Sequence, residues 1–129
     1  MSQPNATIDF LGYTFKRTGK GRLIRVPRQK SMKRFRESIK AVTKRTSGIS
    51  LSATITRINR IARGWYSYFS ESIPSTFDDA DGFIRRRLRA LLRKRHKAPS
   101  FGTGDAHRLW PNTFFTAHGL LSIHATHVA

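Results

Sequence analysis

The chain has 129 residues, with 25 Lys and Arg against 7 Asp and Glu and a formal net charge of +18 at pH 7. A chain of this length buries roughly two thirds of its unfolded surface, enough for one hydrophobic core but too little for a multidomain enzyme. The absence of cysteine excludes a disulfide scaffold, a thiol nucleophile and a thiolate zinc site. No stretch approaches the ~18 apolar residues of a membrane span, and the N-terminus lacks the features of a signal or transit peptide, so we expect a cytosolic protein without a membrane partner.

The positive charge is concentrated in one part of the chain. Of the 25 basic residues, 24 lie between Lys16 and Lys97, and from Lys16 to Ser70 the only acid is Glu37. Because such a charge repels itself in a compact fold, it usually persists where a polyanion neutralises it. We therefore expect a nucleic acid as the partner, bound by the folded body of the protein and not by a tail.

The N-terminal segment predicts a β-hairpin. Residues 8–15 are rich in aromatic and β-favouring residues, and the glycine-containing stretch 18–21 separates them from a second apolar run at 23–26. Pro27 should end the second strand or confine it to an edge, because proline cannot donate a hydrogen bond to the ladder.

Two amphipathic helices are predicted next. The first begins with an N-cap at Ser31 and closes at Ser47–Gly48, and the second begins near Ser50 or Ser52. Gly64 suggests close packing or a local bend, because glycine costs about 1 kcal/mol relative to alanine inside a helix. The apolar stripes expected to face the core are Met32, Phe35, Ile39 and Val42 in the first helix, and Leu51, Ile55, Ile58, Ala62, Trp65 and Phe69 in the second.

A third helix should follow Pro74 and start at Ser75 or Thr76. Three acids lie in its first turns, where they would complement the helix dipole, and eight cations lie in the thirteen residues from Arg85 to Lys97. After Ala98–Pro99 the composition becomes less basic, which indicates a strap over the bundle. The acids are Asp78, Asp79 and Asp81, and the apolar stripe is Phe77, Ala80, Ile84, Leu88 and Leu91.

Four motifs follow one another along the chain. They are Phe-Leu-Gly-Tyr-Thr-Phe at 10–15, Ile-Ala-Arg-Gly-Trp-Tyr-Ser-Tyr-Phe at 61–69, Phe-Ile-Arg-Arg-Arg-Leu-Arg at 83–89, and Trp-Pro-Asn-Thr-Phe-Phe at 110–115 with Gly-Leu-Leu-Ser at 119–122. In this order and at these separations, the first three resemble the maturase-specific domain, also called the thumb or domain X, of bacterial group II intron reverse transcriptases. The last resembles the C-terminal extension of bacterial members that lack an endonuclease domain. The resemblance covers nearly the whole chain from Ile8 onward.

The resemblance implies a mainly α fold in three parts. Residues 1–30 would form the palm-to-thumb junction with the β-hairpin, residues 31–97 a basic three-helix thumb-like bundle, and residues 98–129 an irregular or short-helical C-terminal strap. It also implies that the bundle binds structured group II intron RNA, assists its folding and splicing and, in an intact enzyme, holds an RNA–DNA or DNA duplex. The expected location is the bacterial cytoplasm, associated with the nucleoid or with ribonucleoprotein.

The sequence offers no convincing catalytic group. The family's polymerase chemistry needs an aromatic-X-Asp-Asp strand, whereas the aromatic before Asp78–Asp79 is Phe77, one position too late. His118, His124 and His127 fit no familiar zinc spacing and are interpreted as surface or packing residues. We therefore expect no catalytic residue, no bound metal, no cofactor and no enzymatic activity of the chain itself.

The predicted RNA interface is electrostatic, with one aromatic side chain. Trp65 and Phe69 continue an apolar stripe and belong to the core, whereas Tyr66 and Tyr68 are more open to stacking on unpaired bases. Arginine and lysine side chains would neutralise phosphates and release condensed counterions. The predicted RNA-binding residues are Lys33, Arg34, Arg36, Lys40, Lys44, Arg57, Arg60, Arg63, Tyr66, Arg85, Arg86, Arg87, Arg89, Arg93, Lys94 and Arg95.

Three functions remain open at this point. The leading one is an RNA-binding maturase module. The second is the thumb of a split or truncated reverse transcriptase that needs a separate fingers and palm polypeptide, and the third is a basic protein that binds any nucleic acid. Because the strand at Phe10–Phe15 would lack the palm, we also expect an exposed edge and self-association through the N-terminal strand.

Overall fold

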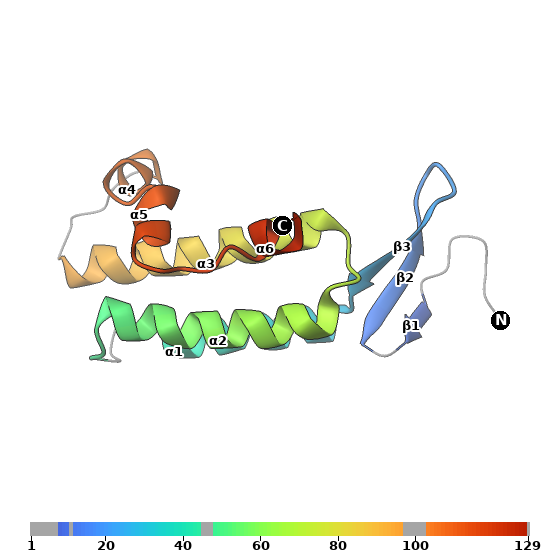
Figure 1. The fold of residues 1–129 in the computed structure, drawn as a ribbon, viewed down its shortest axis with the longest axis horizontal. Helices are drawn as coiled ribbons and strands as arrows, with labels where there is room; N and C mark the ends of the chain where they lie inside the picture. Colours follow the sequence, from blue (N-terminus) through green and yellow to red (C-terminus); the bar gives the residue numbers. More distant parts are fainter. Residues whose placement is uncertain (1–7, 11, 45–47, 97–102, 129) are drawn as a thin grey trace.

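The computed structural model describes residues 8–10, 12–44, 48–96 and 103–128 of the chain. Three long helices lie alongside one another, with a small sheet at one end of the bundle and three short helices along the third long helix (Figure 1). The mainly α fold with an N-terminal hairpin and a short-helical C-terminal strap is thus confirmed. In chain order the elements are β1 (Ile8–Phe10), β2 (Tyr13–Arg17), β3 (Leu23–Pro27), α1 (Gln29–Val42), α2 (Leu51–Phe69), α3 (Pro74–Arg95), α4 (Thr103–Leu109), α5 (Asn112–Ala117) and α6 (Ile123–Val128).

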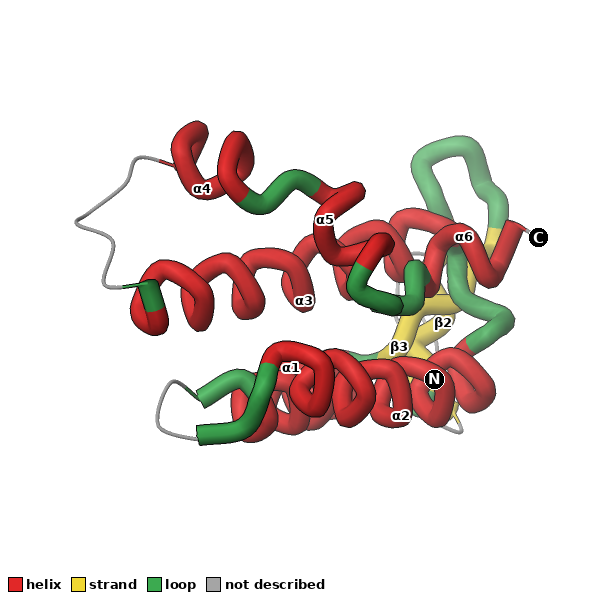
Figure 2. The backbone as a smooth tube through the Cα atoms, turned by 60° about the vertical axis from the view of Figure 1, so that its left-hand side comes forward, coloured by secondary structure: helices red, strands yellow, loops and turns green. Residues whose placement is uncertain are grey.

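The core lies between the apolar faces of the three long helices. Figure 2 shows α1 and α2 close together, with α3 facing them, and both α2 and α3 contact α1. The predicted stripes are confirmed: Phe35 and Ile39, the stripe of α2 from Ile55 onward, and the whole stripe of α3 are buried. Met32, Val42 and Leu51 are partly buried against the same core. Burial of these stripes removes apolar surface from water, which is the main force that holds the helices together.

The N-terminal sheet has three strands where the sequence predicted two. Gly12 adopts φ +83° and lets the chain turn between β1 and β2, so β2 pairs with β1 on one side and β3 on the other. The expectation of an exposed edge along Phe10–Phe15 is therefore wrong from Tyr13 onward. Tyr13 is buried, and its Oη donates a hydrogen bond to the Tyr68 carbonyl at 3.1 Å. That bond ties the sheet to the end of α2.

The ends of the first two helices agree with the sequence only in part. Helix α1 begins two residues before the predicted N-cap, and Ser31 Oγ instead donates to the Gly12 carbonyl at 3.5 Å. It ends at Val42, before Gly48, which has the expected left-handed φ of +70°; Ser47 lies outside the described residues. Ser50 caps α2 as predicted, since its Oγ accepts the Ala53 N–H at 3.1 Å.

The close packing predicted at Gly64 and the predicted start of the third helix are both wrong. Gly64 lies inside the uninterrupted α2, and a Cβ added there would meet no described residue within 4 Å, so no close packing in the described part of the chain requires glycine. Helix α3 begins at Pro74 itself, where the missing N–H of proline costs no hydrogen bond. Its first turn contains no acidic residue, so the acids do not serve the dipole there.

The C-terminal strap runs back along α3. Helices α4 and α5 lie near the end of α3, and α6 lies near its beginning (Figure 1). Contacts of α6 with both α3 and α2 fix the strap to the bundle. The predicted boundary at Ala98–Pro99 lies outside the described residues. Within the described part of the chain, no helix is long and apolar enough to cross a membrane.

Candidate nucleic-acid interface

Exposed cations project from all three long helices. In the described part of the chain, their side chains make no hydrogen bond or ion pair with another residue. Each charge is therefore available to a partner and repels its neighbours until one binds. These residues are Lys33, Arg34, Arg36 and Lys40 on α1, Lys44 just after it, Arg57, Arg60 and Arg63 on α2, and Arg86 and Lys94 on α3.

A hydrogen bond between α3 and the end of α1 connects the exposed basic faces of these two helices. Arg87 Nε donates a hydrogen bond to Thr43 Oγ1 at 3.1 Å. Thr43 follows the last residue of α1, between Lys40 and Lys44 in the sequence. The guanidinium of Arg87 is thus held at the negative end of the α1 dipole, and the basic surface continues from one helix to the other. Arg85, Arg87, Arg93 and Arg95 are half-buried.

Arg89 does not belong to this surface, although the sequence placed it there. It is only 5% exposed, its Nε donates to the Trp110 carbonyl at 2.9 Å, and its Nη2 donates to Asn112 Oδ1 at 2.8 Å. The guanidinium carbon also lies 5.3 Å from the centre of the Phe115 ring. Burial, and then the charge of Arg85, lower the pKa of Arg89. The prediction fails because Arg89 anchors the strap to α3 and is shielded from an RNA by it.

Tyr66 is likewise a structural residue. It is half-buried, its ring meets the edge of Phe77 with 5.2 Å between centroids, and its hydroxyl lies 3.1 Å from His127 Nδ1. Both its ring and its hydroxyl therefore have partners inside the fold. Tyr68, which is 58% exposed, is the tyrosine of this motif that presents its ring to solvent.

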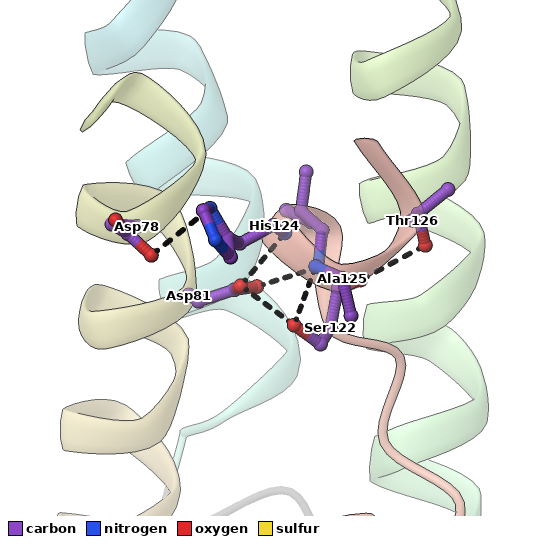
Figure 3. A network of polar contacts seen from close by, with 7 residues as sticks. Asp78, Asp81, Ser122, His124, Ala125 and Thr126 are labelled. Atoms are coloured by element: carbon purple, nitrogen blue, oxygen red, sulfur yellow. Dashed lines mark hydrogen bonds and ion pairs between the residues drawn. The ribbon is translucent and has the colours of Figure 1, made fainter. Parts of the chain in front are cut away.

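Asp81 holds the start of α6 (Figure 3). It is 4% exposed; its Oδ1 accepts the Ile123 N–H at 2.9 Å, and its Oδ2 accepts the His124 N–H at 3.0 Å. Ser122 Oγ donates to the same Oδ2 at 3.1 Å. The N–H groups at the start of a helix have no partner within that helix, so the Asp81 carboxylate on α3 caps α6.

Asn59 supports the strap from α2. Its Nδ2 donates to the Gly119 carbonyl and its Oδ1 accepts the Leu121 N–H, both at 2.8 Å. The sequence did carry a signal for this role. Asn59 lies four residues after Ile55 and three before Ala62, inside the apolar stripe, and a polar residue at such a position is usually buried with hydrogen-bond partners.

The C-terminal histidines have separate partners. His118 Nδ1 lies 2.8 Å from the Phe114 carbonyl oxygen, His124 Nδ1 lies 3.3 Å from Asp78 Oδ1, and His127 contacts Tyr66. Among the residues that the structure describes, no group of three or more His, Asp or Glu side chains could hold a metal ion.

A groove of about 230 Å³ lies between α1 and α2. Its walls are formed by aromatic and aliphatic side chains and by polar side chains of α1. One of the exposed cations, Arg34, belongs to its lining. The full lining is Ser31, Arg34, Phe35 and Ser38 from α1, and Ile61, Trp65 and Phe69 from α2.

The chain also matches a known protein family. Residues 32–110, well over half of the chain, match the profile described as group II intron, maturase-specific domain. The match covers α1 from Met32 onward, all of α2 and α3, and every exposed cation described above. No curated protein gives a significant match to the chain.

Proposed function

The chain belongs to the group II intron maturase-specific domain family, which supports a role in group II intron splicing, and from this premise we propose that it is an RNA-binding module. It binds structured group II intron RNA through the exposed basic faces of α1, α2 and α3 and assists RNA folding. The observation that carries the proposal is the set of exposed cations that have no hydrogen-bond or ion-pair partner among the residues that the structure describes. Their mutual repulsion is relieved when phosphates approach.

The shape of the bundle supports binding to folded RNA. The cations are fixed on long helices that pack through a common apolar core, and Arg87 bridges α3 to the end of α1. A rigid arrangement of this kind favours RNAs whose phosphates have a matching spacing, because recognition of folded RNA depends mainly on shape and backbone position. Selectivity would then come from geometry more than from base sequence.

We also propose that the module contributes no catalytic group of its own. Four of the acids and histidines singled out in the sequence hold the strap in place: Asp78 contacts His124, Asp81 accepts hydrogen bonds from the start of α6, and His127 contacts Tyr66. These contacts give the four side chains structural roles.

The test is an equilibrium titration of the whole chain with a group II intron RNA from the same genome, at two salt concentrations and with excess transfer RNA as competitor. We expect tight binding that survives the competitor and weakens steeply as salt rises. Binding that the competitor abolishes would contradict the proposed selectivity and favour a general polyanion binder. Selective binding that requires an added fingers and palm polypeptide would instead assign the chain to a split reverse transcriptase.

A further inference from the structure

We propose that Arg87 is a preformed binding site for one backbone phosphate of the RNA and that Thr43 positions its guanidinium. This inference rests on the proposed function, because it assigns one phosphate contact within the basic surface. The exposed cations of that surface have no partner in the described part of the chain, whereas Arg87 is half-buried and its Nε donates to Thr43 Oγ1 at 3.1 Å. Arg87 therefore differs from them in having a fixed orientation.

Thr43 can hold this guanidinium because its hydroxyl is itself oriented. The residue is 2% exposed, and its Oγ1 donates to the Ile39 carbonyl at 2.7 Å and, less closely, to the Lys40 carbonyl at 3.4 Å. A hydroxyl has a single proton, so the lone pairs of Oγ1 are left to accept the N–H of Arg87. The guanidinium is thus tied to the buried end of α1 by two consecutive hydrogen bonds.

The outer edge of the Arg87 guanidinium is available to a ligand. A guanidinium carries five N–H donors, and Thr43 accepts the one on Nε. Among the described residues, Nη1 and Nη2 have no hydrogen-bond or ion-pair partner, and neither atom is buried. These two atoms form a planar fork whose parallel N–H groups match two oxygens of a phosphate.

The charges around Arg87 favour an anion from outside the chain. Lys40 and Lys44 are exposed on either side of Thr43 in the sequence, and Lys94 is exposed seven residues after Arg87 on the same side of α3. Residues 38–70 and 82–100 contain no Asp or Glu. The end of the α1 dipole is equivalent to only about half a negative charge, so the cations outweigh it. A phosphate therefore has no carboxylate of these segments as a competitor.

Fixing Arg87 before the RNA binds makes the contact stronger and more selective. An arginine that moves freely in solution loses rotamer freedom when it binds a phosphate. Arg87 has lost part of that freedom on folding, so less is lost on binding. Its fork also faces one direction, which requires the phosphate to lie at one place relative to α1 and α3. Folded RNA meets such a requirement, because its phosphates have fixed positions.

The experiment measures the affinity of variants with unchanged net charge for a group II intron RNA from the same genome. Arg87→Lys removes the fork and should weaken binding about tenfold, as expected for the loss of a hydrogen bond to a charged group. Thr43→Val keeps the side-chain shape and removes the acceptor, and it should weaken binding about fivefold, because Arg87 is then immobilised only when the RNA binds. Thr43→Ser keeps the hydroxyl and should bind as the original chain does.

Matched controls separate this effect from general changes in the basic surface. Arg86→Lys changes the neighbouring residue, which is exposed and has no partner in the described part of the chain, and should leave the affinity nearly unchanged. Thr56→Val removes a hydroxyl that donates to the Ser52 carbonyl at 3.0 Å but accepts no arginine within the described ranges. It should also bind as the original chain does.

Two further measurements show whether Thr43 acts through Arg87. In the double variant, Thr43→Val should add nothing to the effect of Arg87→Lys, because the side chain that Thr43 positions is already gone. In NMR spectra of the free chain, the Nε–H signal of Arg87 is assigned by its loss in Arg87→Lys. This proton should exchange slowly with water in the original chain and quickly in Thr43→Val.

The outcomes separate the two proposals. Unchanged affinity of Thr43→Val, or losses that add up in the double variant, would overturn the Arg87 site and leave the RNA-binding function standing. Equal binding by Arg87→Lys and the original chain would overturn the site even if Thr43→Val does not fold, and so would fast exchange of the Arg87 Nε–H in the original chain. If the original chain does not bind the intron RNA, both proposals fail.

Discussion

Arginine has opposite roles in two regions of the molecule. One region is the exposed basic faces of the long helices, and the other is the side of α3 that the C-terminal strap covers. Arg86 is exposed and has no polar partner in the described part of the chain, whereas Arg89, three residues later on the same helix, is buried and donates hydrogen bonds to Trp110 and Asn112. The charge of Arg86 stays hydrated, so it costs little folding free energy. The charge of Arg89 can be buried because its hydrogen bonds replace the lost hydration. The comparison teaches that the number of arginines in a helix does not reveal how many of them can contact a ligand.

The largest expected effect concerns Arg89. Replacing it with Ala removes the hydrogen bonds that Arg89 donates to the Trp110 carbonyl and to Asn112 Oδ1, together with its contact with Phe115, so the free energy of unfolding should fall by about 3 kcal/mol. Arg86→Ala is the control and should change it by no more than about 0.5 kcal/mol. Urea unfolding measures the free energy of unfolding of both variants. An equal loss in both would contradict the structural role assigned to Arg89.

The next effect concerns Asp81. In Asp81→Asn the side chain loses its charge and presents an amide donor to backbone donors of α6, which should cost about 2 kcal/mol. Amide hydrogen exchange should show faster exchange at Ile123 and His124 than in the original chain. Asp79→Asn, at an exposed position of α3, should leave both exchange rates unchanged; unchanged rates in Asp81→Asn would contradict its role as a cap.

A smaller effect is expected from charges on the outer surface. The triple variant Arg36→Ala, Lys40→Ala and Lys44→Ala should reduce the slope of log affinity for intron RNA against log salt by about 2, because each lost phosphate contact removes about 0.7 of slope. Its thermal unfolding should be close to that of the original chain. A triple variant at Lys16, Lys20 and Arg22, exposed in the sheet region, removes the same charge and should keep the slope; equal losses would show that net charge alone drives binding.

The smallest effect concerns two glycines. Gly64→Ala should raise the free energy of unfolding by about 0.5–1 kcal/mol, because a Cβ there meets no described residue and alanine favours the helix. Gly12→Ala should lower it, since Gly12 has φ +83° and an added Cβ would lie 3.3 Å from Tyr68 Cε1. Calorimetry of both variants checks the opposite signs, and destabilisation by Gly64→Ala would reveal packing at that position.

Much of the fold was predictable because it depends on local periodicity. Apolar residues three and four apart identified the core faces of three helices, and Trp65 and Phe69 proved to be buried as the spacing required. The sheet was less predictable, because the turn at Gly12 divides one run of β-favouring residues into two strands. Helix ends shifted by a few residues, because α3 already begins at Pro74, with Ile73 at its N-cap position, and Thr43 ends α1 ahead of Gly48.

The sequence predicted that the candidate interface is strongly basic, but it did not show which of its residues are exposed. The amino-acid sequence by itself determined the basic bundle, its apolar stripes and the family motifs, because these depend on residue type and spacing along the chain. Only the tertiary structure decided that Arg89, Tyr66 and Asp81 are occupied internally and that α1 and α2 enclose a groove. Helical periodicity tells which side of its own helix a residue occupies, but which distant segment covers that side depends on how the chain folds back.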